Sequence, residues 1–200
     1  MGPPESDPLP ALLSEIRACR LCEAHLPLGP RPVLRAERSA RILIAGQAPG
    51  TRVHASGIPW HDPSGDRLRD WLGLAPETFY DATRVAIVPM GFCYPGRSGG
   101  GDAPPRPECA PAWRERLLGL LPSVRLTLVI GQYAQTWHLR ERRKATLGDT
   151  VAAWAEYGPA LFPLPHPSPR NRRWLRDRPW FEAEVLPALQ RRVRESLEAP

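Results

Sequence analysis

Four cysteines are spaced in a way that suits a metal site. Cys19 and Cys22 form a C-x2-C pair, while Cys93 and Cys109 bracket one loop rich in glycine and proline. Four thiolates suit either tetrahedral zinc or a cubane iron–sulfur cluster, and the spacing alone does not choose between them. The simpler alternative is four unrelated buried thiols. Structural disulfides are not expected, because the chain opens without the basic and apolar regions of an export signal.

Two loops near the first third of the chain carry further polar chemistry. The segment Gly46-Gln47-Ala48-Pro49-Gly50 follows an apolar run, and its glycines permit close approach of the backbone to a ligand. It matches neither a Walker loop nor a dinucleotide-binding fingerprint, so a plain strand-to-helix turn is the alternative. Residues 57–66 place Trp60, His61 and two carboxylates in one short stretch. The alternative there is a core tryptophan, with Asp62 and Asp66 acting as helix caps.

A third loop, near the C-terminus, has the sequence His166-Pro-Ser-Pro-Arg-Asn. A lone histidine is usually structural or solvated. Here the flanking prolines stiffen the loop, and Arg170 supplies a group suited to phosphate beside the imidazole. Rigidity combined with charge indicates a functional loop.

The elements that must position these loops are indicated by apolar runs alternating with amphipathic segments. Short continuous apolar runs are typical of strands buried on both faces of a parallel sheet. Strands are expected at 41–45, 83–90, 126–130 and 160–164, and helices at 11–20, 64–74, 111–121, 132–143 and 179–197. This alternation predicts a three-layer α/β/α fold around a mostly parallel four-stranded sheet. Since functional loops lie beyond the carboxyl ends of such strands, these loops should converge on one cleft.

The composition is that of a single compact domain. Of 200 residues, 42% are hydrophobic and 24% charged, and no apolar run approaches the length of a bilayer span. We expect residues 1–10 to form a flexible tail and residues 11–200 one domain, present as a cytoplasmic monomer with no membrane association. The net charge of +6 rests almost wholly on arginine. That excess suits phosphate contacts, but GC-rich coding produces the same bias.

Taken together, these motifs resemble those of the uracil-DNA glycosylase superfamily, above all its iron–sulfur branches, families 4 and 5. Gly46-Gln47-Ala48-Pro49-Gly50 resembles their first motif, which is Gly-Glu-Ala-Pro-Gly in family 4 and Gly-Leu-Ala-Pro in family 5. His166-Pro167-Ser168 resembles their second motif, and Leu128-Val129-Ile130-Gly131 resembles the strand between them. The cysteine spacing is similar to that of their cluster ligands. The resemblance extends from Cys19 to Asn171.

The resemblance implies a role for each matching residue. The four cysteines, Cys19, Cys22, Cys93 and Cys109, would hold a 4Fe-4S iron–sulfur cluster, with zinc as the alternative. Asp62 and Gln47 would act on a water, and His166 would stabilise charge on the departing base. Trp60 would stack on a flipped uracil. Further contacts to the substrate are expected from Gly46, Ala48, Pro49, Gly50, His54, Met90, Gly91, Ser168, Arg170 and Asn171.

The implied function is base-excision repair: hydrolysis of the N-glycosidic bond of uracil, or a related deaminated base, in DNA. Two departures bear on it. Gln47 replaces the family 4 glutamate and cannot accept a proton, and Pro89 stands where that family has a uracil-reading asparagine. Backbone groups of Met90 and Gly91 are candidates to read the base instead. Two other functions remain open: a damaged-DNA-binding or cross-linking protein without turnover, and a metal-stabilised structural adaptor.

Overall fold

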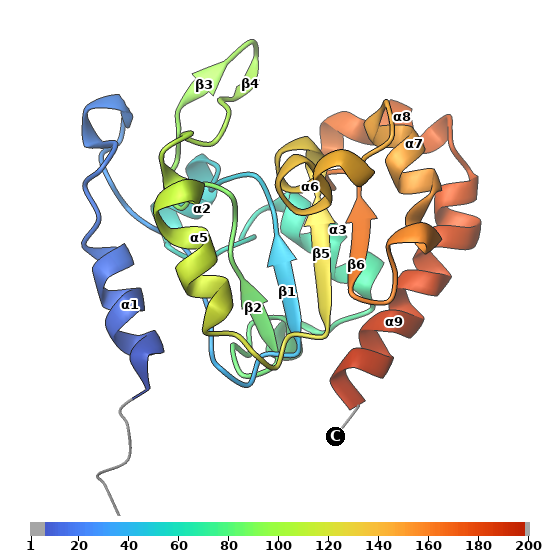
Figure 1. The fold of residues 1–200 in the computed structure, drawn as a ribbon. Helices are drawn as coiled ribbons and strands as arrows, with labels where there is room; N and C mark the ends of the chain where they lie inside the picture. The colour runs from blue at the N-terminus through green and yellow to red at the C-terminus, as the bar shows by residue number, and fades with distance from the viewer. Residues whose placement is uncertain (1–6, 199–200) are drawn as a thin grey trace, which may run out of the picture.

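The computed structural model describes residues 7–198 (Figure 1). Its helices are α1 Pro8–Arg17, α2 Thr51–Ser56, α3 Pro63–Leu72, α4 Pro76–Phe79, α5 Cys109–Gly119, α6 Gly131–Leu139, α7 Leu147–Ala152, α8 Arg172–Arg176 and α9 Leu186–Glu198. Its strands are β1 Ile42–Ala45, β2 Val85–Ile87, β3 Arg97–Ser98, β4 Gly101–Asp102, β5 Leu126–Ile130 and β6 Leu161–Leu164. Within this range, no helix is both long and apolar enough to cross a bilayer.

The central sheet has the strand order β2-β1-β5-β6, with every neighbouring pair parallel. In β1, Ile44 pairs with Ile87 on one side and Leu128 on the other. The expected four-stranded parallel sheet is therefore confirmed. Because all four strands point the same way, the loops that follow them meet at one edge of the molecule.

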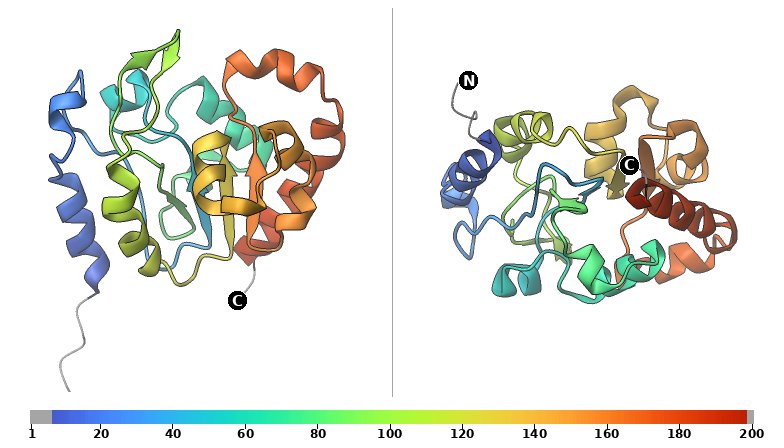
Figure 2. Two further views of the ribbon diagram at one scale, coloured as in Figure 1. Left: turned by 45° about the horizontal axis from the view of Figure 1, so that its top comes forward. Right: turned by 90° about the horizontal axis from the view of Figure 1, so that it is seen from below.

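Helices cover both faces of the sheet, which explains why the strands read as unbroken apolar runs. Figure 2 shows α5 and α6 on one face and α3 and α9 on the other. In β1, Ile42 and Ile44 belong to the core cluster shared with α3 and α9, while Leu43 packs in the cluster that contains α1 and α5 residues. Side chains of a strand alternate between faces, so one apolar run serves two cores.

The N-terminal helix begins earlier than expected. Helix α1 starts at Pro8, and the Asp7 carboxylate caps it by accepting a hydrogen bond from the Leu9 amide at 3.0 Å. Proline at the first helical position suits this geometry, and Leu9 is buried in the core. The predicted tail is therefore wrong for residues 8–10; its first six residues lie outside the described range.

Two segments expected to be irregular contain short elements. The loop after β1 includes α2, and the loop between Cys93 and Cys109 includes the two-stranded hairpin β3–β4. Gly99 and Gly100 form its turn with φ of 56° and 78°, a conformation that favours glycine. In Figure 1 this hairpin projects above the carboxyl edge of the sheet. It therefore stands beside the loops predicted to form the site.

Candidate active site

A cavity of about 240 Å³ opens at the carboxyl edge of the sheet. It is lined by Val33, Gly46, Gln47, Ala48, Pro49, Gly50, Val53, Pro59, Trp60, Asp62, Ser64, Ile87, Pro89, Asp102, His166, Ser168 and Arg170. The three residues predicted to carry the chemistry, Gln47, Asp62 and His166, thus face one space although they come from three separate loops. The parallel sheet brings them together. Gln47 and Asp62 lie in the connection that follows β1, before and after α2, and His166 lies in the loop that follows β6.

Trp60 forms an aromatic wall of this cavity. Its ring centroid lies 5.5 Å from that of His166, with 33° between the planes. The indole approaches the first motif so closely that a Cβ added to Gly46 would lie 2.8 Å from Trp60 Cζ2. A residue larger than glycine at position 46 would therefore displace the indole.

The backbone of Trp60 is held in an unusual conformation. Its φ is 57°, in the left-handed region that few non-glycine residues adopt. The Trp60 carbonyl accepts a hydrogen bond from the Tyr80 hydroxyl at 3.3 Å, and a Cβ on Gly65 would lie 1.7 Å from that same oxygen. Glycine at position 65 is thus required for the chain to turn tightly enough to present the indole. Such strain is common at functional sites.

His166 is positioned as a neutral hydrogen-bond donor. The Ser168 amide donates to His166 Nδ1 at 3.2 Å, so in the neutral ring the proton resides on Nε2. Burial lowers the pKa of His166, while the nearby Asp62 opposes this effect. The imidazole therefore stays uncharged near neutral pH and can donate from Nε2.

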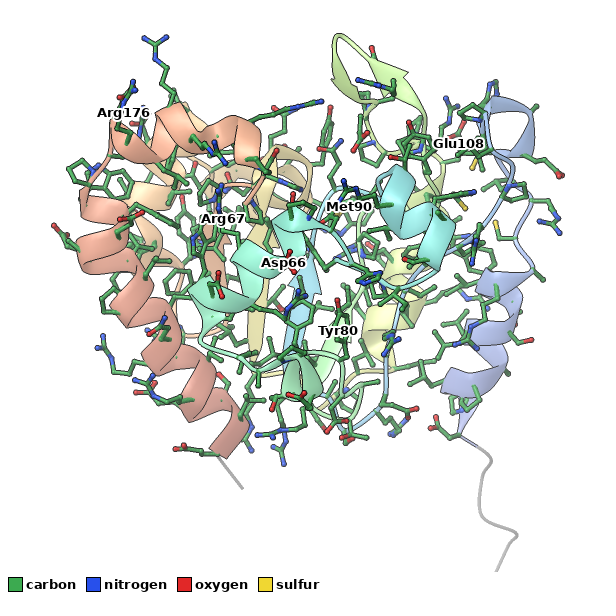
Figure 3. All side chains as sticks on the ribbon, turned by 180° about the vertical axis from the view of Figure 1, so that it is seen from behind. Asp66, Arg67, Tyr80, Met90, Glu108 and Arg176 are labelled. Atoms are coloured by element: carbon green, nitrogen blue, oxygen red, sulfur yellow. The ribbon has the colours of Figure 1, made fainter. Side chains whose placement is uncertain are left out.

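The loop around His166 is braced from two sides. Arg67 of α3, which is labelled in Figure 3, donates to the carbonyls of Pro167 and Ser168 at 3.3 and 3.2 Å. From within the loop, Asn171 Nδ2 donates to the His166 carbonyl at 2.7 Å. These bonds fix the backbone of the loop that carries the imidazole. Arg67 was not predicted from the sequence, since nothing local distinguishes it from other helical arginines.

Asp62 both caps a helix and faces the cavity. One oxygen, Oδ1, accepts a hydrogen bond from the Gly65 amide at 2.8 Å, which makes Asp62 the N-cap of α3. The capping interpretation and the functional one are therefore compatible. The Asp62 side chain that caps α3 also lines the cavity.

Gln47 ties the first motif to the hairpin. Its side-chain Nε2 donates to the Ala103 carbonyl at 3.0 Å, while its main-chain carbonyl accepts from the Gly91 amide at 2.9 Å. An amide at this position thus holds a wall of the cavity in place. It cannot take a proton from water.

Four residues predicted to contact the substrate do not line this cavity: His54, Met90, Gly91 and Asn171, of which Asn171 lines the hollow beside it. His54 lies on α2 next to Val53; Val53 lines the cavity and His54 does not. The centroid of the His54 ring lies 6.1 Å from that of the Tyr94 ring. The amides of Met90 and Gly91 donate to the carbonyls of Gly46 and Gln47, both at 2.9 Å. These two amides are thus already engaged in joining the segment after β2 to the first motif.

A second hollow of about 230 Å³ adjoins the cavity and contains a residue that sequence reasoning missed. It is lined by Gln47, Ala48, Gly101, Asp102, His166, Ser168, Arg170 and Asn171. Asp102, on β4, faces both spaces. The paired glycines at 99 and 100 are a hairpin signal that could have predicted β4, but not that the hairpin folds toward His166.

The four cysteines line a separate cavity between the segment after α1 and the start of α5. The amide of Phe92 donates to Cys109 Sγ at 3.4 Å. Burial raises the pKa of Cys93 to about 11 and that of Cys109 to about 12. All four are free thiols. The predicted ligands are thus brought together from distant parts of the chain.

Within residues 7–198, no three His, Cys, Asp or Glu side chains lie close enough to hold a single metal ion. This differs from the convergence of the cysteines on one cavity.

Comparison with known proteins finds similarity to one family and to solved structures. The family model "Uracil DNA glycosylase superfamily" matches residues 34–190. The chain is also similar to the solution NMR structure of a candidate uracil DNA glycosylase from Methanosarcina acetivorans, with 17% identity and a TM-score of 0.48, covering 80% of this chain and 98% of that one.

Proposed function

Because the chain belongs to the uracil DNA glycosylase superfamily, we propose that it hydrolyses the N-glycosidic bond of uracil, or a related deaminated base, in DNA. The observation that carries this proposal is the cavity shared by Trp60, Asp62 and His166. It combines an aromatic face, a carboxylate and a neutral donor, which are the groups that cleavage of a nucleoside bond requires.

On the base side of the reaction, negative charge develops as the bond to the sugar breaks. His166 Nε2 can donate to a carbonyl oxygen of the base, where a preorganised donor stabilises the developing anion. The Trp60 indole offers a face on which the flipped ring can stack. Flipping costs a few kcal/mol, and stacking offsets part of that cost.

On the sugar side, positive charge develops in an oxocarbenium-like transition state. The Asp62 carboxylate, fixed by its capping bond, stabilises that charge and orients a water toward C1′. Gln47 can help position the water through its amide oxygen, while its amide nitrogen is engaged by Ala103. The carboxylate acts here by field and geometry.

Binding of the DNA strand itself falls to the second motif. Arg170 lines both hollows and can contact a flanking phosphate, and Arg172 and Arg173 follow it at the start of α8. Pro167 and Pro169 stiffen the loop, which suits a wedge that fills the space left by the flipped base.

A base-release assay tests this function. Oligonucleotides carrying uracil, hypoxanthine or xanthine would be incubated with the protein, followed by alkali to cleave abasic sites. We expect scission with at least one of them, and strong losses in Asp62→Asn and His166→Ala. Binding of damaged DNA without base release would instead support the alternative of a damaged-DNA-binding protein without turnover.

We further propose that Cys19, Cys22, Cys93 and Cys109 hold a 4Fe-4S cluster. Their convergence on one buried cavity and the Phe92 N–H···S bond support this, because such bonds are typical around cluster sulfurs. The cluster would serve as a cross-link between the segment after α1 and the loop that carries β3 and β4.

The cluster is tested by purifying the protein without oxygen. Broad absorbance near ~400 nm with about four irons per chain is expected. Cys109→Ser should abolish the absorbance and lower the melting temperature. A colourless protein that contains one zinc would show that the alternative metal occupies the site.

A further inference from the structure

Asp102 is an exposed residue at the end of β4 that lines the cavity. It is the last residue of the hairpin β3–β4, whose glycine turn returns the chain toward the first motif. Its Oδ2 lies 3.2 Å from where a Cβ on Gly50 would stand. The absence of a side chain at Gly50 therefore leaves room for this carboxylate beside the first motif.

The residue next to Asp102 is anchored directly to Gln47. The Ala103 carbonyl accepts a hydrogen bond from Gln47 Nε2 at 3.0 Å. This bond holds the neighbouring Asp102 beside the hollow that Gln47 lines. Both residues line the same hollow as His166. The residue that cannot accept a proton thus positions one that can.

The charged groups around Asp102 come from three elements. Asp62 at the start of α3 is a like charge, while Arg97 on β3 and Arg170 in the His166 loop are opposite charges. Within residues 7–198, Asp102 has no ion-pair partner within 4.0 Å. Burial, reinforced by Asp62, raises the pKa of Asp102 against the effect of the two arginines. A carboxylate with a raised pKa is a better base near neutral pH.

We propose that Asp102 is a catalytic residue of this site: the general base that accepts a proton from the attacking water. The water oxygen forms a bond to C1′ as the C1′–N bond breaks, and the electron pair of that bond leaves with the base. The proton from the water goes to Asp102, while Asp62 stabilises the sugar cation. This inference rests on the proposed function and assigns the proton acceptor that Gln47 does not provide.

The test measures single-turnover base release between pH 4 and 9 for the wild type and Asp102→Asn. General-base removal should reduce the rate by about 10²–10⁴-fold and abolish the rise in rate with pH on the acid side. Asp102→Glu should retain part of the activity. Asp70→Asn, which changes an exposed carboxylate of α3 that does not line the cavity, should leave rate and pH profile unchanged.

The double variant Asp102→Asn/Gln47→Glu provides a rescue experiment. A glutamate at position 47 restores a proton acceptor in the same hollow, so we expect at least ten-fold recovery over Asp102→Asn. Asp102→Asn with a wild-type rate and pH profile would overturn the role of Asp102 while leaving the proposed function intact. An inactive wild type with an active Gln47→Glu single variant would also overturn it. If neither protein releases any base, the proposed function itself fails.

Discussion

The Trp60 indole and the His166 imidazole lie 5.5 Å apart although they follow strands that are not neighbours in the sheet. Trp60 belongs to the loop after β1 and His166 to the loop after β6, with β5 between the two strands. Both rings line one cavity, so a single planar ligand can contact both. Three predictions develop from the geometry around this pair, and a fourth from a buried pair elsewhere in the fold.

Gly46→Ala should impair base release without unfolding the protein. The new methyl group would meet Trp60 Cζ2 at 2.8 Å, so the indole must move away from the position in which it flanks the cavity. We expect at least a ten-fold fall in single-turnover rate, measured on a uracil oligonucleotide. Gly119→Ala is the matched control, because nothing lies within 4 Å of its added Cβ. Equal rates for both variants would show that the indole position is unimportant.

Asp62 variants should separate the helix cap from the charge. Asn can still accept the Gly65 amide bond, whereas Ala cannot, so Asp62→Ala alone should lose about 1 kcal/mol of stability. Both variants should lose base release by a similar factor, because both remove the negative charge. Urea unfolding and single-turnover kinetics measure the two effects. Full activity in Asp62→Asn would contradict a role for the charge.

Arg170→Gln should weaken binding to DNA of any sequence. A phosphate contact contributes about 0.9 to the slope of log K against log salt on duplex DNA, and that contribution should disappear. Fluorescence anisotropy at several salt concentrations gives the slope. Arg194→Gln, an exposed change in the last turns of α9 at the other end of the sheet, should leave it unchanged. An unaltered slope in Arg170→Gln would remove this arginine from the DNA contact.

The free energy of unfolding should decrease as the pH is lowered, because of a buried pair formed by Arg114 of α5 and His138 of α6. His138 Nε2 accepts from the fully buried Arg114 at 2.7 Å, and burial together with Arg114 lowers the pKa of His138 to about 3. The unfolded state takes up a proton near pH 6.5, whereas the native state does not until about pH 3. Below pH 6.5 the unfolded state therefore binds more protons, and stability decreases as pH falls.

His138→Gln measures this contribution. Glutamine can still accept from Arg114 but does not titrate, so the fall in stability between pH 6.5 and 4.5 should shrink by about 2 kcal/mol. Urea denaturation at several pH values provides the comparison. Parallel pH profiles for the wild type and the variant would show that His138 takes up its proton at the same pH in the native state as in the unfolded state.

Much of the sheet was predictable because its strands are buried on both faces. The runs around Ile42–Ala45 and Leu126–Ile130 are apolar throughout, which few other environments require. The convergence of Gln47, Asp62 and His166 followed from parallel strands and from motif resemblance. The resemblance named residues, and the sheet topology determined that they share one edge.

The parts that were missed depend on contacts between distant segments. The position of Asp102 depends on how the hairpin β3–β4 folds back onto Gln47, and no local pattern encodes that direction. The orientation of His54 depends on the short helix α2, whose six residues carry too weak a periodicity to predict. Pro8 was assigned to a tail, whereas Asp7 provides the cap that starts the helix at this residue.

The hydrogen bonds that hold the two motifs of the site in place should delay the return of activity when the protein folds. Arg67 bonds to Ser168 across 101 positions, and Gln47 bonds to Ala103 across 56. Contacts of such sequence separation are entropically costly to close and form slowly. Enzymatic competence should therefore return in a refolding experiment only with the last kinetic phase, after helical circular dichroism has recovered.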